Sequence, residues 1–106
     1  MNIPSLSDAR RVRVLAGIPA CNMNLFDRCQ FLVGDPAVWI EWQNNEVACE
    51  SLFLLRDIEM ERASSQARAT HVACPAQYAP PKGLSGDRET ATAQALAECL
   101  NQHKIH

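Results

Sequence analysis

Apolar and polar residues alternate most regularly in the middle of the chain. From position 38 to position 42, every second residue is valine, isoleucine or tryptophan. A period of two in β-branched and aromatic residues predicts a strand over residues 37–43. Asn44 and Asn45 tolerate the positive φ of a tight turn, and residues 47–55 then return as a second strand. The pattern therefore predicts an antiparallel hairpin.

The end of this second strand indicates the fold class. Residues 52–55 are apolar at every position, so both faces of the strand must be covered. Such a strand normally lies in the centre of a sheet that has helices on both sides. Residues 71–74 predict a further short strand, which Pro75 ends. We expect an α/β domain built in three layers, with a mixed sheet and helices on both faces.

Two helices are predicted before the hairpin. Ser5 and Asp8 have the spacing of a capping box, and apolar residues recur at helical intervals within residues 9–16. A glycine and a proline shortly afterwards end this helix. Residues 23–31 carry an apolar stripe that suits a second, short helix.

Two more helices are predicted after the hairpin. Asp57 is placed to cap a helix over residues 58–68, whose first turn is acidic as the helix dipole favours. A loop rich in proline and glycine follows the short strand. Ser85 or Asp87 then caps a last helix that runs to about residue 103.

Length and charge narrow the class of protein. The 106 residues fit one domain, residues 1–106, and 47% hydrophobic residues with a net charge of −2 argue against disorder. There is no basic block, so nucleic acid is not an expected partner. The longest apolar run is four residues, and Asp8 with three nearby arginines occupies the place of a signal-peptide core. We expect a cytoplasmic protein without a membrane segment.

The five cysteines are widely spaced, odd in number and without a CxxC pair. A disulfide framework favours an even number, and a zinc knuckle needs paired ligands. We therefore expect reduced thiols that are mostly buried and act as small hydrophobic residues.

Candidate catalytic or ligand-binding residues are few. His71 and Cys74 have H-x-x-C spacing, but two ligands do not make a zinc site. Residues 83–87 precede a helix and could cradle a phosphate, yet they lack the P-loop lysine, which favours a plain loop and cap. His103 and His106 lie at the chain end, where solvated residues are usual. The sequence predicts no catalytic, cofactor or metal residue.

Trp39 and Trp42 are the candidate contact residues. They point to opposite faces of one predicted strand. Because residues 52–55 already need cover on both faces, we expect one tryptophan in the core and the other near a subunit contact. This predicts a homodimer or a larger homo-oligomer.

One segment resembles a known family. Residues 52–63, LFLLRDIEMERA, are similar to the creatinase/prolidase N-terminal domain, in which an L-L-V-P strand enters an L-E-x-E-R-A helix. Glu59, Glu61, Arg62 and Ala63 match, whereas Arg56 and Asp57 stand where that family has valine or proline.

The resemblance extends more loosely to other parts of the chain. The Arg-rich helix predicted over residues 9–16 resembles the opening helix of the family, and residues 24–26 through 31–34 resemble its N-x-x-Y-L-T-G-F region. Residues 83–100 resemble the loop and helix near its end. Residues 17–21 replace the usual D-A-L-L-V strand. The resemblance implies a ribonuclease H-like motif within the expected three-layer fold.

The same resemblance implies a role. Complete members of the family are similar to Xaa-Pro aminopeptidases and dipeptidases, whose following domain holds two metal ions on aspartate, histidine and glutamate ligands. No position here matches those motifs, so no cofactor is expected in this chain. It would be the non-catalytic N-terminal domain, partnered by its own C-terminal catalytic domain and shaping subunit contacts and the active-site entrance.

Two alternatives remain open. One is a free-standing binding or dimerisation module of the same fold. The other is a small thiol- or metal-dependent enzyme that uses His71 and the cysteines, although no catalytic constellation favours it. The sequence that follows His106 in the reading frame would distinguish the accessory domain from the free-standing module.

Overall fold

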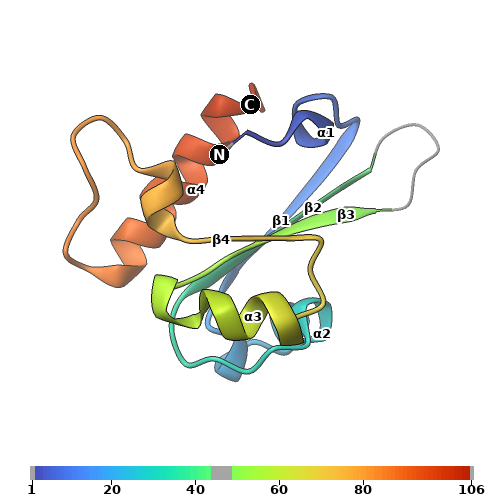
Figure 1. The fold of residues 1–106 in the computed structure, drawn as a ribbon, viewed down its shortest axis with the longest axis vertical. Coiled ribbons are helices and arrows are strands. Elements are labelled where there is room, and N and C mark those ends of the chain that lie inside the picture. Colours follow the sequence, from blue (N-terminus) through green and yellow to red (C-terminus); the bar gives the residue numbers. More distant parts are fainter. Residues whose placement is uncertain (1, 44–48, 106) are drawn as a thin grey trace.

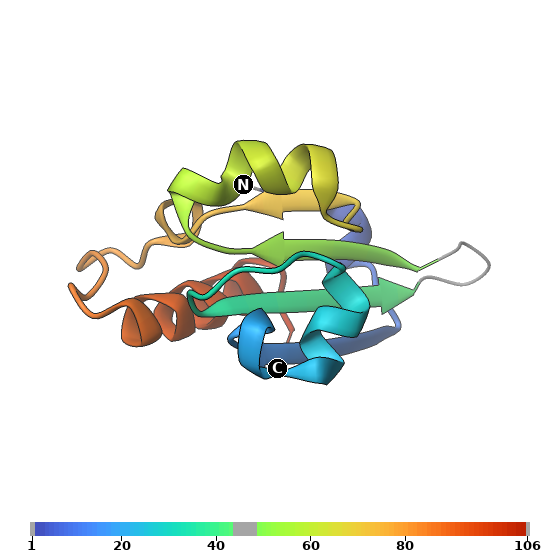
Figure 2. The same cartoon turned by 90° about the horizontal axis from the view of Figure 1, so that it is seen from below.

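The computed structural model describes residues 2–43 and 49–105. In this part of the chain, β1 (Arg11–Gly17), β2 (Ala37–Gln43), β3 (Glu50–Leu54) and β4 (His71–Ala73) form one sheet in that order. Neighbouring strands are antiparallel, except that β3 and β4 are parallel. Figure 2 shows the strands side by side, from β1 in blue to β4 in orange.

Helices pack on both faces of this mixed sheet. In Figure 1, α1 (Pro4–Ser7) and α4 (Arg88–Gln102) lie above the sheet, and α2 (Met23–Cys29) and α3 (Met60–Gln66) lie below it. Three short 3₁₀ turns complete the elements of the described residues. Their bounds are Pro19–Cys21, Asp57–Glu59 and Pro75–Tyr78.

The sheet divides the buried residues into two clusters. On the side of α1 and α4, alternate residues of β2 pack with β3, Leu6, Tyr78 and Cys99. On the side of α2 and α3, the other residues of β2 pack with Phe53 of β3, Leu25 of α2 and Ala63 of α3. Leu52, Phe53 and Leu54 of β3 have no exposed surface. The prediction that β3 is a central strand covered on both faces is confirmed.

The two strands of the predicted hairpin are β2 and β3, and their antiparallel pairing is confirmed. β2 has the predicted bounds, and Trp39 of β2 pairs with Phe53 of β3 in an antiparallel register. β3 begins at Glu50. The predicted turn residues, Asn44 and Asn45, lie outside the described residues.

The helix predicted over residues 9–16 is wrong, because this segment is mostly strand β1. Its two arginines alternate with Val12 and Val14, which is the period of two of a strand. The three-residue interval from Val12 to Leu15 also fits a helix and obscured this period. Pairing with β2 along seven residues supplies the backbone hydrogen bonds of β1. The predicted capping box is wrong too: α1 is a single turn whose N-cap is Ile3, without a side-chain cap.

The two helices after the hairpin differ from their predictions only in their bounds and caps. The predicted helix over 58–68 is a 3₁₀ turn followed by α3, and Asp57 is the first residue of that turn rather than its cap. Of the two predicted caps of α4, Ser85 and Asp87, the cap is Asp87, which accepts a hydrogen bond from the Thr90 amide, 3.0 Å away. None of the described helices is long and apolar enough to cross a membrane.

Candidate functional site

Both candidate tryptophans are buried within the chain. Trp39 is 4% exposed on the side of α2 and α3, and Trp42 is 2% exposed on the side of α1 and α4. The Trp39 indole N–H donates to Glu41 (2.8 Å), and that of Trp42 donates to the Ser5 hydroxyl of α1 (3.2 Å). The tryptophans face opposite sides, as predicted. The expectation that the sheet cannot bury both is wrong, because helices cover each face.

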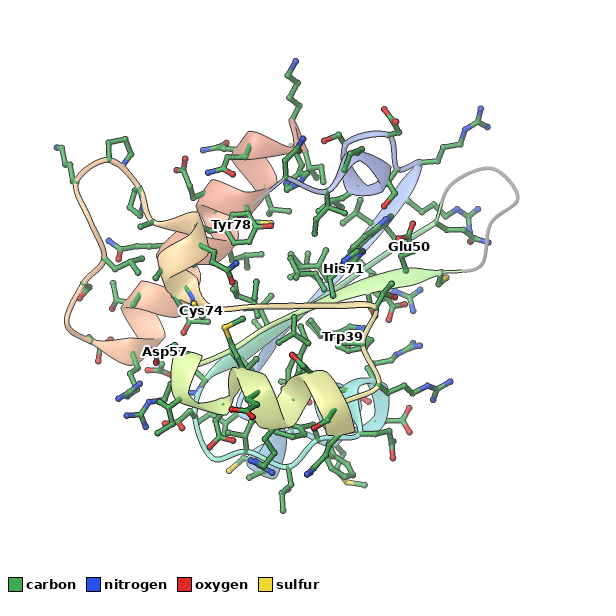
Figure 3. All side chains as sticks on the ribbon, viewed as in Figure 1. Trp39, Glu50, Asp57, His71, Cys74 and Tyr78 are labelled. Atoms are coloured by element: carbon green, nitrogen blue, oxygen red, sulfur yellow. The ribbon has the colours of Figure 1, made fainter. Side chains whose placement is uncertain are left out.

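His71 belongs to a polar cluster around Trp42. The two rings are stacked, with centroids 5.9 Å apart and an interplanar angle of 11°. His71 Nε2 lies 3.4 Å from Glu50 Oε1 on the neighbouring strand. Figure 3 shows His71 beside Glu50, with Cys74 farther along the chain near Asp57. His71 and Cys74 therefore do not converge, and no described group of three or more His, Cys, Asp and Glu side chains could hold a metal ion.

A hollow of about 330 Å³ lies where β3 and β4 end, beside the start of α4. Arg56, Asp35, Asp57 and Arg88 give it two cations and two anions. Arg56 Nη1 lies 3.6 Å from Asp35 Oδ2, while Arg56 Nε is buried without a hydrogen-bond partner among the described residues. The balanced charges select neither an anionic nor a cationic ligand.

The loop before α4 uses its polar groups within the chain. The Ser85 amide donates to the Gln94 side chain (2.8 Å), and the Asp87 amide donates to the Ser85 hydroxyl (3.1 Å). Hydrogen bonds from Thr90 lower the pKa of the Asp87 carboxyl. These contacts support the plain loop and cap over a phosphate cradle.

Arg62 joins the two segments that carry the family resemblance. Its guanidinium lies 4.2 Å from the centre of the Phe31 ring, and its Nη2 donates to the Leu32 carbonyl (3.4 Å). It also pairs with Glu59 one turn earlier, and Ala63 next to it is fully buried. Sequence reasoning matched these residues to a motif but did not find this contact. The i, i+3 spacing of Glu59 and Arg62 was the available signal for their pairing.

His103 is buried, and the expectation that it is solvated is wrong. It is 1% exposed, and its Nε2 accepts from the Ile3 amide at 3.0 Å. Its Nδ1 donates to the Cys99 carbonyl at 2.7 Å, which places the imidazole proton on Nδ1. Burial raises the pKa of the neighbouring Tyr78 and Cys99 side chains above their ordinary values. The cluster fastens the first residues of the chain to the end of α4.

The cysteines are expected to fall into two reactivity classes. Cys21 and Cys49 are exposed, whereas Cys29, Cys74 and Cys99 are buried. Burial raises the pKa of Cys29 and Cys99, which keeps these thiols protonated and slow to react. A thiol-reactive dye should label two cysteines rapidly in the native protein and all five in denaturant. Rapid native labelling of Cys29 or Cys99, located by mass spectrometry, would contradict this burial.

Comparison of the chain with protein-family models, with curated proteins and with solved structures found no match.

Proposed function

We propose that this chain is the non-catalytic N-terminal domain of an Xaa-Pro metallopeptidase, contributing to subunit contacts and to the entrance of the active site. The contact made by Arg62 carries the proposal. It joins the helix of the L-E-x-E-R-A type to residues 31–34, so the two matching stretches of sequence are neighbours in one layer. If the two stretches matched the family only by chance, there would be no reason to expect them to be in contact.

Strand β1 supports one part of the family resemblance and removes another. The family has a strand between its opening helix and the N-x-x-Y-L-T-G-F region, and residues 17–21 did not supply it. β1 ends at Gly17 and is followed by α2, which contains residues 24–26. A strand thus precedes the matching helix, which supports the proposal. This strand occupies the segment that the resemblance matched to the family's opening helix, so that part of the match is lost. A ribonuclease H-like, creatinase-type arrangement of the three layers is part of the proposal.

The proposal places the chemistry outside this chain. Two metal ions bound by Asp, Asp, His, Glu and Glu ligands in a following domain would activate water and polarise the scissile carbonyl. The reading frame after His106 tests this directly. A domain with those ligands is the expected result, and a stop codon immediately after His106 would overturn the accessory role in favour of a free-standing binding or dimerisation module.

The purified 106-residue chain is expected to show no cleavage of an Xaa-Pro peptide with added manganese, cobalt or zinc. Metal-assisted hydrolysis requires several convergent ligands that hold the ion and leave a position open for water. Peptide products would be measured by chromatography. The control is the same chain joined to the downstream domain, which should cleave under identical conditions. Metal-dependent cleavage by the isolated chain would refute the non-catalytic assignment.

A further inference from the structure

Strand β1 is an open edge of the sheet. It pairs with β2 on one side, and it has no neighbouring strand on the other side among the described residues. Figure 2 shows it as the lower edge of the sheet. The strand is seven residues long, and its central residue, Val14, is 36% exposed. An extended edge of this length with exposed apolar side chains is a template for pairing with another strand.

We infer that β1 pairs antiparallel with β1 of a second copy, around a two-fold axis that passes beside Val14. A two-fold axis perpendicular to the sheet keeps each side chain on its own face, so only residues of equal parity can stand opposite each other. Centring on Val14 is the register that pairs all of Arg11–Gly17. Val14 then faces Val14 of the second copy.

The charges of β1 favour this register. Arg13 stands opposite Leu15 of the second copy, and Arg11 stands opposite Gly17, so no arginine faces an arginine. Centring on Arg13 would place Arg13 opposite itself, and centring on Val12 would place Arg11 opposite Arg13, both of which are unfavourable. Arg13 is also partly neutralised by Glu41 of β2, 3.6 Å away.

The apolar residues on one face of β1 favour the same partner, of which Val14 and Ala16 are exposed and Val12 is half-buried. Val12, Val14 and Ala16 pair with Trp42, Ile40 and Val38 of β2, so they lie on the face of α1 and α4. In the two-fold register they form an unbroken apolar row across the junction with the same residues of the second copy. The strand therefore pairs with its own copy without placing like charges directly opposite each other, and its apolar row continues across the junction, as a two-fold interface requires.

A second copy of this chain is thus the partner in the subunit contact of the proposed function, and only this link to the contact rests on that function. Its test measures association of the 106-residue chain, without any peptidase assay. If the chain does not dimerise through β1, the proposed N-terminal domain role is unaffected. If a stop codon follows His106, the proposed pairing of β1 is unaffected.

The test uses charge exchange at Val14, measured by sedimentation equilibrium at protein concentrations up to about 1 mM. Val14→Glu and Val14→Lys each place like charges opposite each other, and each should weaken the dimer by on the order of tenfold. An equimolar mixture of the two variants should restore association as a heterodimer. The matched controls are Ile58→Glu and Ile58→Lys, because Ile58 is 66% exposed in the turn that follows β3.

The wild type and both Ile58 variants should associate equally. A wild type that stays monomeric at the highest concentration overturns the inference. So does a dimer that both Val14 variants leave unchanged, because it must then use another face. A mixture that does not restore association overturns the register, and circular dichroism of each variant confirms that the monomer is folded.

Discussion

Replacing Trp42 by alanine should lower the free energy of unfolding by about 3–5 kcal/mol, the usual cost of removing a large buried aromatic side chain. Trp42 is 2% exposed between β2 and α1, where it packs in the main cluster and stacks on His71. Its removal leaves a cavity and deprives Ser5 of its indole partner. Urea denaturation followed by far-ultraviolet circular dichroism measures the change without relying on the altered fluorescence.

The control for this variant is Leu32→Ala, because the Leu32 side chain is 63% exposed. Its effect should stay within about 0.5 kcal/mol, as for most surface substitutions. A loss below about 1 kcal/mol for Trp42→Ala would contradict the burial, since core truncations of this size cost several times more. Such a result would agree instead with the prediction that one of the two tryptophans lies near a subunit contact.

His103→Ala is expected to lower the free energy of unfolding by about 2–4 kcal/mol, from an unsatisfied donor and the lost packing. The substitution leaves the Ile3 amide without its acceptor while that residue is only 4% exposed. The loss should be accompanied by faster hydrogen exchange at the Ile3 amide, because the start of the chain is no longer fastened to α4.

Gln102→Ala is the matched control, because Gln102 is the exposed neighbour of His103 at the end of the same helix. It should change neither the stability nor the exchange of the Ile3 amide appreciably. His103→Gln tests the hydrogen bond separately from the volume, because an amide oxygen can accept from Ile3. If His103→Ala leaves exchange at Ile3 unchanged, the contact does not hold this segment in solution.

The candidate site was only partly predictable. The H-x-x-C pair could be dismissed from its two ligands, and the structure adds that His71 and Cys74 do not converge. The contact of Arg62 with Phe31 could not be predicted, since thirty-one positions separate them and the distance depends on how α3 lies against the loop after α2. The role of β1 as an open edge was hidden because its segment was predicted to be a helix.

The sequence by itself determined the elements whose own pattern is unambiguous. β2 has a strict period of two, β3 is apolar on both faces, and Asp87 caps α4 through a local hydrogen bond. Each of these signals lies within a few residues, so backbone geometry alone links it to the structure.

Only the tertiary structure decided the elements that depend on distant partners. β1 is a strand because it shares a ladder of backbone hydrogen bonds with β2, although its apolar spacing also suits a helix. Both tryptophans are core residues because α1 and α4 cover one face of the sheet and α2 and α3 cover the other. His103 is buried at the contact with the start of the chain, where Ile3, one hundred positions away, donates to it. The burial of a side chain depends on the residues that pack against it, and these are often distant in the sequence, so the local pattern does not reveal it.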